Sequence, residues 1–411
     1  MHDSSEHSID LRFSVPFVHR LRVTDDVTDA DFPELLAVLE GGASGKPKVL
    51  VITEQALSSA AERISRRLAA SGAVQLVQQP LLVRGGEDVK NSSAEVERIL
   101  RQINDSNLDR RSYIVAIGGG AMLDAVGYAA AIAHRGIRLV RLPTTTLAQG
   151  DSGVGVKNAI NYFEKKNWVG TFAVPWAVIN DSALLESLSD RDFHSGFSEA
   201  VKVSLLKDRD EFDWLCQNAD SIRRRETKSC KKAIHRSCML HLKHITEGGD
   251  PFEMLEARPL DFGHWSAHRL EPLTDYQVRH GEAVAIGVAI DTIYSSIKFG
   301  FPEEDMWKVC SCLRRLGMPL WHDGLNPIDR LMTGLEEFRQ HLGGRLTITM
   351  LRNVGDPINV HEIDRVAMNA SIHQLQEMQV ELNVLAQQDK PTGVRLTHPE
   401  SSDVDSRQPS G

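Results

Sequence analysis

Along the first 181 residues, short apolar runs alternate with segments in which apolar residues recur every three or four positions. The apolar runs have the length of buried strands and lie in KVLVITEQAL (48–57), RSYIVAIGGG (111–120), IRLVRLPTTTLAQ (137–149) and TFAVPWAVIND (171–181). Helical spacing lies between them, in SSAEVERILRQIND (92–105) and AMLDAVGYAAAIAHRG (121–136). Strands that alternate with helices indicate a parallel sheet of the doubly wound type.

Three local features add detail to this first part. LRFSVPFVHRLRV (11–23) alternates well enough to predict a strand or hairpin, with Pro16 at an edge or bulge because proline cannot donate to a strand ladder. VQLVQQPLLV (74–83) predicts a second strand pair. Ser93 is expected to cap the helix that follows it.

Beyond Asp181 the pattern changes to helical spacing with few β-branched runs. We therefore predict an α/β N-terminal, Rossmann-like nucleotide-binding domain at 11–181 and an all-α C-terminal metal-binding domain at 182–388. The active site is expected in the cleft between them. Residues 1–10 and 389–411 are rich in Ser, Asp, Gln, Pro and His, so both are predicted to be disordered tails.

Composition excludes several classes of partner. A chain of 411 residues has room for two domains, and its net charge of -9 gives no reason to expect nucleic acid or a membrane surface as partner. Its five cysteines lack C-x-x-C spacing and are odd in number, and the chain has neither a signal peptide nor a long apolar run. We therefore expect a cytoplasmic protein with reduced thiols.

Three histidines near an apolar helix, His264, His268 and His280, predict part of a metal site. His264 and His268 are four residues apart and share a face if the segment is helical. A further ligand must come from elsewhere, and the best candidate is Glu199, an acid in an apolar helical pattern where an unpaired charge is costly. Three such ligands leave one coordination position open, as a catalytic zinc requires. For any single histidine, an ordinary surface or hydrogen-bonded core role is the simpler interpretation, but not for the set.

The glycines Gly118, Gly119 and Gly120 end a predicted strand and begin a helix. Backbone without side chains can approach a diphosphate there, and the amides at the helix N-terminus can hold it. A triple glycine alone is also consistent with a tight turn. Other polar groups follow successive strands, where ligands of such sheets bind: Glu87, Lys90, Asp124, Thr144 and Thr145.

Six motifs, in order, resemble the sugar phosphate cyclases, whose best known member is 3-dehydroquinate synthase. They are GGGAMLDAVGYAAAIAHRG, LPTTTLAQGDSGVGVKNAIN, KKNWVGTF, GFSEAVK, DFGHWSAH and RHGEAVAIG, and the resemblance runs from about residue 11 to 388. It implies an N-terminal nucleotide-binding domain, a helical C-terminal domain and a homodimer.

The resemblance also implies roles for individual residues. Glu199, His264 and His280 match the zinc ligands. NAD-contacting positions are matched by Glu87, Lys90, Gly118, Gly119, Gly120, Asp124, Thr144 and Thr145, and substrate or cofactor positions by Asp151, Lys157, Lys166, Asn167, Lys202 and Lys243. His268 matches a histidine near the leaving phosphate, and Arg135 an arginine that reaches this phosphate across the dimer.

The reaction implied by the family begins with transient oxidation of a substrate hydroxyl, for which NAD accepts a hydride and zinc lowers the hydroxyl pKa. The ketone acidifies the adjacent C–H, phosphate leaves by β-elimination, and the hydride returns. Ring opening and an intramolecular aldol closure then give a carbocycle. Cobalt can replace zinc in such a site.

Several departures concern the substrate, a seven-carbon sugar phosphate. Asp261 replaces the asparagine of a phosphate-binding NFGH motif, and Ala257, next to Arg258, replaces the arginine that binds the substrate carboxylate. A late lysine-rich motif is replaced by FRQHLGGRL, with Arg339 or His341 as substitutes. These changes resemble cyclases of sedoheptulose 7-phosphate, which has no carboxylate. Lys243 and His268 instead favour the dehydroquinate type, so the sequence leaves the substrate open.

Two other functions are consistent with parts of the sequence. A metal- and NAD-dependent polyol dehydrogenase of the glycerol dehydrogenase type would share the fold, the glycine turn and the metal site, but it does not need the lysines. A non-catalytic binding protein would not need to retain the complete ligand trio together with Lys157 and Lys202.

Overall fold

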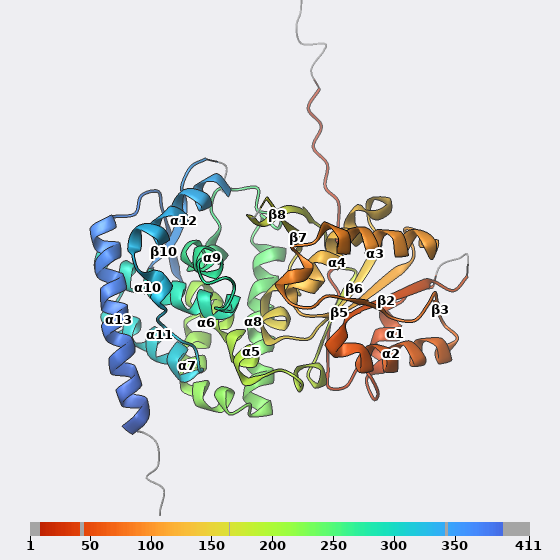
Figure 1. Cartoon of the computed structure of the whole chain (residues 1–411), viewed down its shortest axis with the longest axis horizontal. Coiled ribbons are helices and arrows are strands. Elements are labelled where there is room, and N and C mark those ends of the chain that lie inside the picture. Colours follow the sequence, from red (N-terminus) through yellow and green to blue (C-terminus); the bar gives the residue numbers. More distant parts are fainter. Residues whose placement is uncertain (1–8, 42–44, 164, 342–343, 389–411) are drawn as a thin grey trace, which may run out of the picture.

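The structure is a computed structural model that describes residues 9–41, 45–163, 165–341 and 344–388. Figure 1 shows two lobes, an α/β lobe formed by the first part of the chain and a helical lobe formed by the rest. The predicted tail at 389–411, and the first eight residues of the other tail, lie outside the described residues. Among the described helices, none is both long and apolar enough to cross a membrane.

A seven-stranded sheet forms the centre of the first lobe, and all its strand pairs are parallel. Its strands are β1 (Leu21–Thr24), β2 (Lys48–Glu54), β3 (Gln75–Leu76), β4 (Leu81–Val83), β5 (Tyr113–Gly118), β6 (Arg138–Pro143) and β9 (Ala177–Asp181). The order across the sheet is β1-β9-β6-β5-β2-β3, and β4 also pairs with β2. Because the strands are parallel, their carboxyl ends meet at one edge, where ligands of such sheets bind.

Alternation along the central strands buries both faces of the sheet. In β2, Leu50 and Ile52 face one core with helices α3 (Ser93–Asp105) and α4 (Gly120–Ile132). Val49 and Val51 face a second core on the opposite side, with helices α1 (Phe32–Val38) and α2 (Ser58–Ser71). This burial on both faces is the reason that these strands are almost continuously apolar.

A separate antiparallel hairpin, β7 (Lys157–Tyr162) and β8 (Lys165–Phe172), packs on helix α4. It follows a π-helical turn at Ala148–Ser152. The contact with α4 requires a glycine, because a Cβ atom on Gly127 would lie 1.8 Å from Oδ1 of Asn158. The hairpin was not predicted from the sequence. Its residues were assigned to motifs of the sugar phosphate cyclases, and no strand pattern was identified in them.

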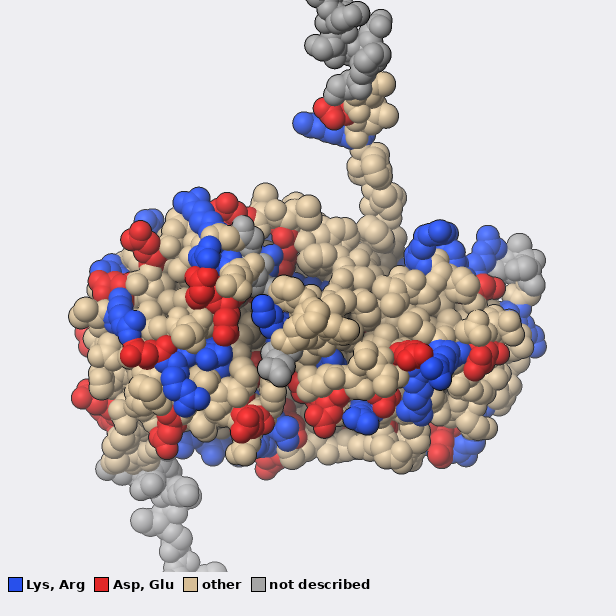
Figure 2. All heavy atoms as spheres, turned by 45° about the horizontal axis from the view of Figure 1, so that its top comes forward, with Lys and Arg blue, Asp and Glu red and all other residues tan. Residues whose placement is uncertain are grey.

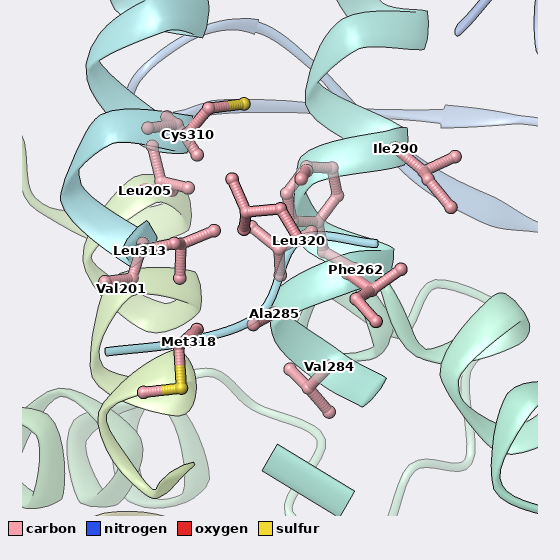
Figure 3. Packing of buried hydrophobic residues seen from close by; sticks show 14 of the residues in the cluster. Val201, Leu205, Phe262, Val284, Ala285, Ile290, Cys310, Leu313, Met318 and Leu320 are labelled. Carbon is pink, nitrogen blue, oxygen red and sulfur yellow. The ribbon is translucent and has the colours of Figure 1, made fainter. Parts of the chain in front are cut away.

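The second lobe is built around helix α10 (His280–Phe299), which is buried from Gly281 to Ser295. The surrounding helices are α5 (Asp190–Ser195), α6 (Phe197–Lys207), α7 (Arg209–Arg223), α8 (Thr227–Glu247), α9 (His264–Leu273), α11 (Glu303–Arg315), α12 (Ile328–His341) and α13 (Arg365–Gln388). Figure 3 shows apolar side chains of α6, α10 and α11 meeting in this core.

Three predictions about secondary structure need correction. The second lobe is not all-helical, because β10 (Ile348–Asn353) and β11 (Asp356–Val360) form an antiparallel hairpin whose apolar residues pack against α10. The predicted strand or hairpin at 11–23 is reduced to β1, since residues 9–20 are extended without a strand partner among the described residues. Helix α3 starts at Ser93, so the cap position belongs to Ser92, whose side chain accepts no capping hydrogen bond.

Candidate active site

A cavity of about 820 Å³ lies between the two lobes and is lined by both. The first lobe contributes the glycine turn after β5, the loop after β6 and the β7–β8 hairpin. The second lobe contributes side chains from α6, α8, α9 and α10. The cavity therefore lies at the carboxyl ends of the parallel strands, facing the helical domain, as predicted for the active site.

Glu199, His264 and His280 meet at the helical wall of the cavity. Oε1 of Glu199 lies 3.5 Å from Nε2 of His264 and 3.8 Å from Nε2 of His280, and each residue offers one ligand atom within 4.8 Å of the others. Glu199 is 1% exposed, and its Oε1 accepts no hydrogen bond among the described residues. A buried acceptor that faces two imidazole nitrogens without hydrogen bonds fits a divalent metal held by one carboxylate and two histidines.

Glycines let the helices that carry these ligands approach each other. A Cβ atom on Gly287 of α10 would lie 1.9 Å from the carbonyl oxygen of Gly263, the residue before His264. Asp291, also on α10, accepts hydrogen bonds from the Gly263 amide and from Nε1 of Trp265, both at 2.8 Å. The start of α9, and with it His264, is therefore fixed against α10.

His268 lies on the same face of α9 as His264, with ring centroids 5.3 Å apart, as its spacing predicted. It does not join the Glu199 group. It belongs to a second group with Glu271 and His280. Burial lowers the pKa of His268 well below its ordinary value, and the neighbouring His264 adds to this effect. A neutral imidazole beside the metal site is the consequence.

Glu271 was not singled out in the sequence, although it is buried between both lobes. Its Oε2 lies 3.0 Å from Nδ1 of His280, and its Oε1 lies 2.6 Å from Nζ of Lys166 on β8. Burial raises the pKa of Glu271, but the charge of Lys166 outweighs this and lowers it overall. The signal in the sequence was an acid one helical turn after His268, and only the fold shows that it supports His280.

Lys202 lies beside the metal ligands. Its Nζ is 2.5 Å from Oε2 of Glu199, and both side chains are buried. Burial lowers the pKa of Lys202, but the charges of Glu199 and Asp151 outweigh this and raise it. Asp151, on the π-helical turn, lies 2.8 Å from Nδ1 of His241. The site thus holds a charged lysine between two carboxylates.

Lys157 and Arg258 share one acid at the outer part of the cavity. Nζ of Lys157 contacts Oε1 of Glu253, and Nη1 of Arg258 lies 3.8 Å from Oε2 of the same residue. Asp261 lines the same cavity. Position 257, where dehydroquinate synthases have an arginine, is an alanine here. The neighbouring Arg258 reaches the site instead, and it is already paired with Glu253.

The opposite wall contains the predicted cofactor residues. Lys90 is buried, with its Nζ 2.8 Å from Oδ2 of Asp124 and in contact with Oδ1 of Asn167. Glu87 accepts a hydrogen bond from Asn161 at 3.0 Å. Glu54, another residue that the sequence reading missed, ends β2 and accepts a hydrogen bond from the Gly119 amide at 2.8 Å. Gly119, Gly120, Thr144 and Thr145 also line the cavity.

Four predicted residues do not line the cavity. Gly118 ends β5 beneath the turn, and Glu199 lies directly behind the histidines. Lys243 points to solvent, and its Nζ lies 4.0 Å from Oε2 of Glu247. Its position on α8 is about 200° around the helix from His241, which does line the cavity, so Lys243 lies on the other side of the helix. Arg135 is exposed beyond the end of α4. A role for Lys243 at the substrate is therefore not supported by this structure.

The proposed phosphate substitute Arg339 is also directed elsewhere. Its guanidinium donates to both carboxylate oxygens of Glu336, at 2.8 and 2.6 Å, and to the carbonyl oxygen of Gly344. Phe338, one residue earlier, lines the cavity instead. The side chain of His341 lies outside the described residues.

Comparisons with known proteins agree with this fold. Residues 80–195 match the 3-dehydroquinate synthase N-terminal domain, and residues 196–337 match the 3-dehydroquinate synthase C-terminal domain. A 2-epi-valiolone synthase of Actinosynnema mirum is 32% identical over 362 residues, which cover 87% of this chain and 92% of that protein. A 3-dehydroquinate synthase of Halorhodospira halophila is 31% identical over 310 residues, covering 75% and 85%.

A solved structure shows the same fold. The 2-epi-5-epi-valiolone synthase of Streptomyces hygroscopicus subsp. jinggangensis 5008, with NAD+ and Zn2+ bound, superimposes with a TM-score of 0.80 at 23% identity, covering 90% of this chain and 99% of that one. The fold, together with the matched family models and relatives, defines a two-domain protein of the sugar phosphate cyclase class. The chain belongs to the 3-dehydroquinate synthase family, which confirms the resemblance and the fold class predicted from the sequence.

Proposed function

We propose that this protein is an NAD- and zinc-dependent cyclase of a seven-carbon ketose phosphate that has no carboxylate, namely sedoheptulose 7-phosphate. In this proposal it is a carbon–oxygen lyase, since phosphate leaves by β-elimination. The observation that carries the proposal is the joint presence, in one cavity, of the Glu199, His264 and His280 group and of the Lys90, Asp124 and Gly119 wall.

The two walls fit the two cofactors. Glu199, His264 and His280 would hold zinc or cobalt, and Gly119, Gly120 and the start of α4 would hold the NAD diphosphate. When bound, NAD supplies a reversible hydride acceptor and the metal polarises the substrate oxygen. The 2-epi-5-epi-valiolone synthase structure of the same fold contains NAD+ and Zn2+, which supports this choice.

The protein side chains bind the substrate and stabilise charge. Lys202 is buried and charged beside the metal ligands, so it can stabilise an oxyanion on the substrate. Lys157 and Asn167 line the same cavity from the hairpin, and His268 lines it from α9. Together they can orient a phosphate and donate hydrogen bonds to it as it leaves. Exclusion of water by the interdomain position strengthens each of these interactions.

Charge pairing in the outer part of the cavity favours a substrate without a carboxylate. Arg258, the neighbour of the sequence position that binds a carboxylate in dehydroquinate synthases, is already paired with Glu253. Asp261 adds a negative charge nearby and can accept hydrogen bonds from substrate hydroxyls. The 32% identity to a 2-epi-valiolone synthase agrees with this assignment.

The test uses the purified full chain with NAD and zinc and compares two substrates, sedoheptulose 7-phosphate and the carboxylate-bearing heptulosonate phosphate of dehydroquinate synthases. We expect free phosphate and a cyclic product, identified by its mass, from the first substrate, with no net NADH. Turnover of the second substrate alone would overturn the substrate assignment. Stoichiometric NADH from a simple polyol would instead indicate a dehydrogenase, and absence of both zinc and NAD binding a non-catalytic protein.

Cytoplasmic location and a homodimer are part of the same proposal. All five cysteines are buried free thiols, which agrees with a reducing compartment. Arg135 would complete a phosphate site only if a second copy places it there, as the resemblance implies.

A further inference from the structure

The segment from Ile9 to Val18, here called the arm, is an extended stretch that exposes large apolar side chains. Ile9, Leu11, Phe13, Val15, Phe17 and Val18 are between 59% and 89% exposed. Five of them, from Ile9 to Phe17, occupy alternate positions, with Asp10, Arg12, Ser14 and Pro16 between them. Figures 1 and 2 both show the arm rising clear of the body of the molecule. Alternate apolar residues are typical of a strand with one buried face, and this face is uncovered.

The base of the arm is fixed beside the β7–β8 hairpin. The ring of Phe17 lies 6.1 Å from that of Phe252, which in turn lies 5.5 Å from Phe172 at the end of β8. Nε2 of His19 lies 2.8 Å from the carbonyl oxygen of Val154. The point at which the arm leaves the body is therefore defined, and it adjoins the hairpin.

The arm has no flexible point at which it can fold back onto its own hairpin. Pro16 has a fixed φ, and it restricts Val15 before it to extended backbone. Phe17 and His19, which follow, are held by the contacts described above. A reversal close to the body would have to occur at Val15 to His19, which are either restricted or already in contact, and Figures 1 and 2 show the arm directed away from the body of its own chain.

The β7–β8 hairpin offers a complementary surface. Its exposed side chains include Tyr162, Phe163, Trp168 and Phe172, with exposures between 44% and 72%. Trp168 and Phe172 lie on β8, and Tyr162 ends β7, so both strands of the hairpin contribute exposed aromatic rings. Exposed aromatic rings of this kind can pack against the alternate apolar side chains of an extended strand.

We propose that the arm of one copy packs its apolar face on the β7–β8 hairpin of a second copy, and that the second copy returns its own arm in the same way. A two-fold dimer needs donor and acceptor surfaces on the same face of each subunit, and the base of the arm adjoins the hairpin. Ten extended residues span about 33 Å, which is enough to cross a neighbouring hairpin. The proposal concerns assembly and does not depend on the proposed activity.

A matched pair of substitutions in the full-length chain tests the proposal. Phe13→Asp adds one negative charge to the apolar face, and Ser14→Asp adds the same charge to the opposite face. In analytical ultracentrifugation, Phe13→Asp should raise the dimer dissociation constant at least about a hundredfold, because both arms lose a buried ring, while Ser14→Asp should leave it unchanged. A wild-type chain that is monomeric at micromolar concentration, or equal effects of the two variants, overturns the proposal.

A second measurement separates exchange between copies from folding back within one copy. Unlabelled protein with a photo-reactive benzoylphenylalanine at position 13 is mixed with ¹⁵N-labelled wild type until native mass spectrometry shows mixed dimers. After illumination, we expect cross-links that join a light arm peptide to a heavy hairpin peptide. Cross-links between light peptides alone, in a sample that contains mixed dimers, would show that the arm binds its own chain and would overturn the proposal.

Discussion

Nζ of Lys166 on the β7–β8 hairpin lies 2.6 Å from Oε1 of Glu271 on α9, so a buried ion pair joins the two lobes at the cavity. The other oxygen of Glu271 lies 3.0 Å from Nδ1 of His280. With its Nδ1 bound in this way, His280 presents Nε2 to the metal position near Glu199. One carboxylate therefore fixes a predicted metal ligand and also connects the helical domain with the α/β domain.

The first prediction concerns Glu271 itself. Glu271→Ala should weaken zinc binding by about ten- to a hundredfold, because His280 loses the partner that sets its tautomer and orientation. Glu271→Gln should recover much of this affinity, since its amide oxygen can still accept from Nδ1. Titration against a chromophoric zinc chelator measures both variants. Glu337→Ala, an exposed acid on α12, is the control, and unchanged zinc affinity in Glu271→Ala would contradict the assigned role.

Two neighbouring histidines should respond differently to substitution. His264→Ala should abolish turnover and lower the metal content without unfolding the protein, because a ligand of an open site is lost. His268→Ala should retain the metal, since His268 does not belong to the Glu199 group. Atomic emission of the purified variants measures the metal, and circular dichroism measures the fold. Full zinc occupancy in His264→Ala would show that the ligand assignment is wrong.

The sequence was sufficient to predict that Glu199, His264 and His280 come together and that the glycine turn lies at the same cavity, because these residues lie in short motifs with fixed local geometry. Helical phase placed His264 and His268 on one face, and the glycine turn followed an apolar strand. Motif matching without helical phase failed for Lys243. Motif position alone placed it in the site, whereas the phase of α8 turns His241 and His244 to the cavity and Lys243 to solvent.

Residues that act through long-range packing could not be predicted. Glu54 precedes the glycine turn by more than sixty positions, and only the pairing of β2 with β5 brings the two together. Glu253 lies in an irregular loop, and its contacts with Lys157 and Arg258 come from different lobes. The β10–β11 hairpin was missed because a short alternating stretch between helices is a weak signal next to the strong helical periodicity around it.

Lys157→Ala should separate binding from chemistry. The variant should retain zinc and NAD affinity, because Lys157 contacts Glu253 rather than any predicted metal or cofactor residue. Phosphate release should fall at least about a hundredfold, the usual cost of one positioned charge or proton-transfer group. Isothermal titration with NAD and a phosphate-release assay measure the two effects. Loss of NAD binding in this variant would place Lys157 on the cofactor wall instead.

Glu54 should select NAD over NADP. In Rossmann folds an acid on the strand beside the glycine turn binds the ribose 2′-hydroxyl and repels a 2′-phosphate. Here the strand beside the glycine turn is β2, although it precedes β5 in the chain. Thr53 of β2 pairs with Ile117 of β5, so Glu54, the last residue of β2, lies opposite the turn. Glu54→Ser should weaken NAD binding about tenfold and improve NADP binding, as measured by fluorescence titration. Glu97→Ser, an exposed acid on α3, is the control, and an unchanged preference would exclude this role.

Asp291 should make the stability of the helical domain depend on pH. Burial raises the pKa of this carboxyl from its ordinary 3.8 to about 7, although Trp265 and Gly263 donate hydrogen bonds to it. Between these two pH values the folded state therefore binds more protons than the unfolded state. As a result, the free energy of unfolding falls as pH rises from about 4 to 7. Below this range the carboxyl is protonated in both states and does not change the free energy of unfolding. At pH 8 this carboxyl lowers the free energy of unfolding by at most about 4 kcal/mol relative to low pH.

Asp291→Asn removes this titration, so the variant should lack the part of the pH dependence that Asp291 supplies. Urea unfolding at pH 5 and pH 8 measures the free energy of unfolding of both proteins, and the difference between them should grow in favour of the variant as pH rises. Asparagine can accept one of the two hydrogen bonds but presents an amide to the other donor, so the variant is expected to be less stable than wild type at pH 5. Asp364→Asn on the surface is the control: Lys298 lowers the pKa of Asp364 below its ordinary 3.8, so this carboxyl is ionised in both the folded and the unfolded state from pH 5 to pH 8, and its variant should keep the pH dependence of the wild type. Parallel pH profiles for Asp291→Asn and wild type would mean that the carboxyl stays charged in the folded protein, held by its two N–H donors.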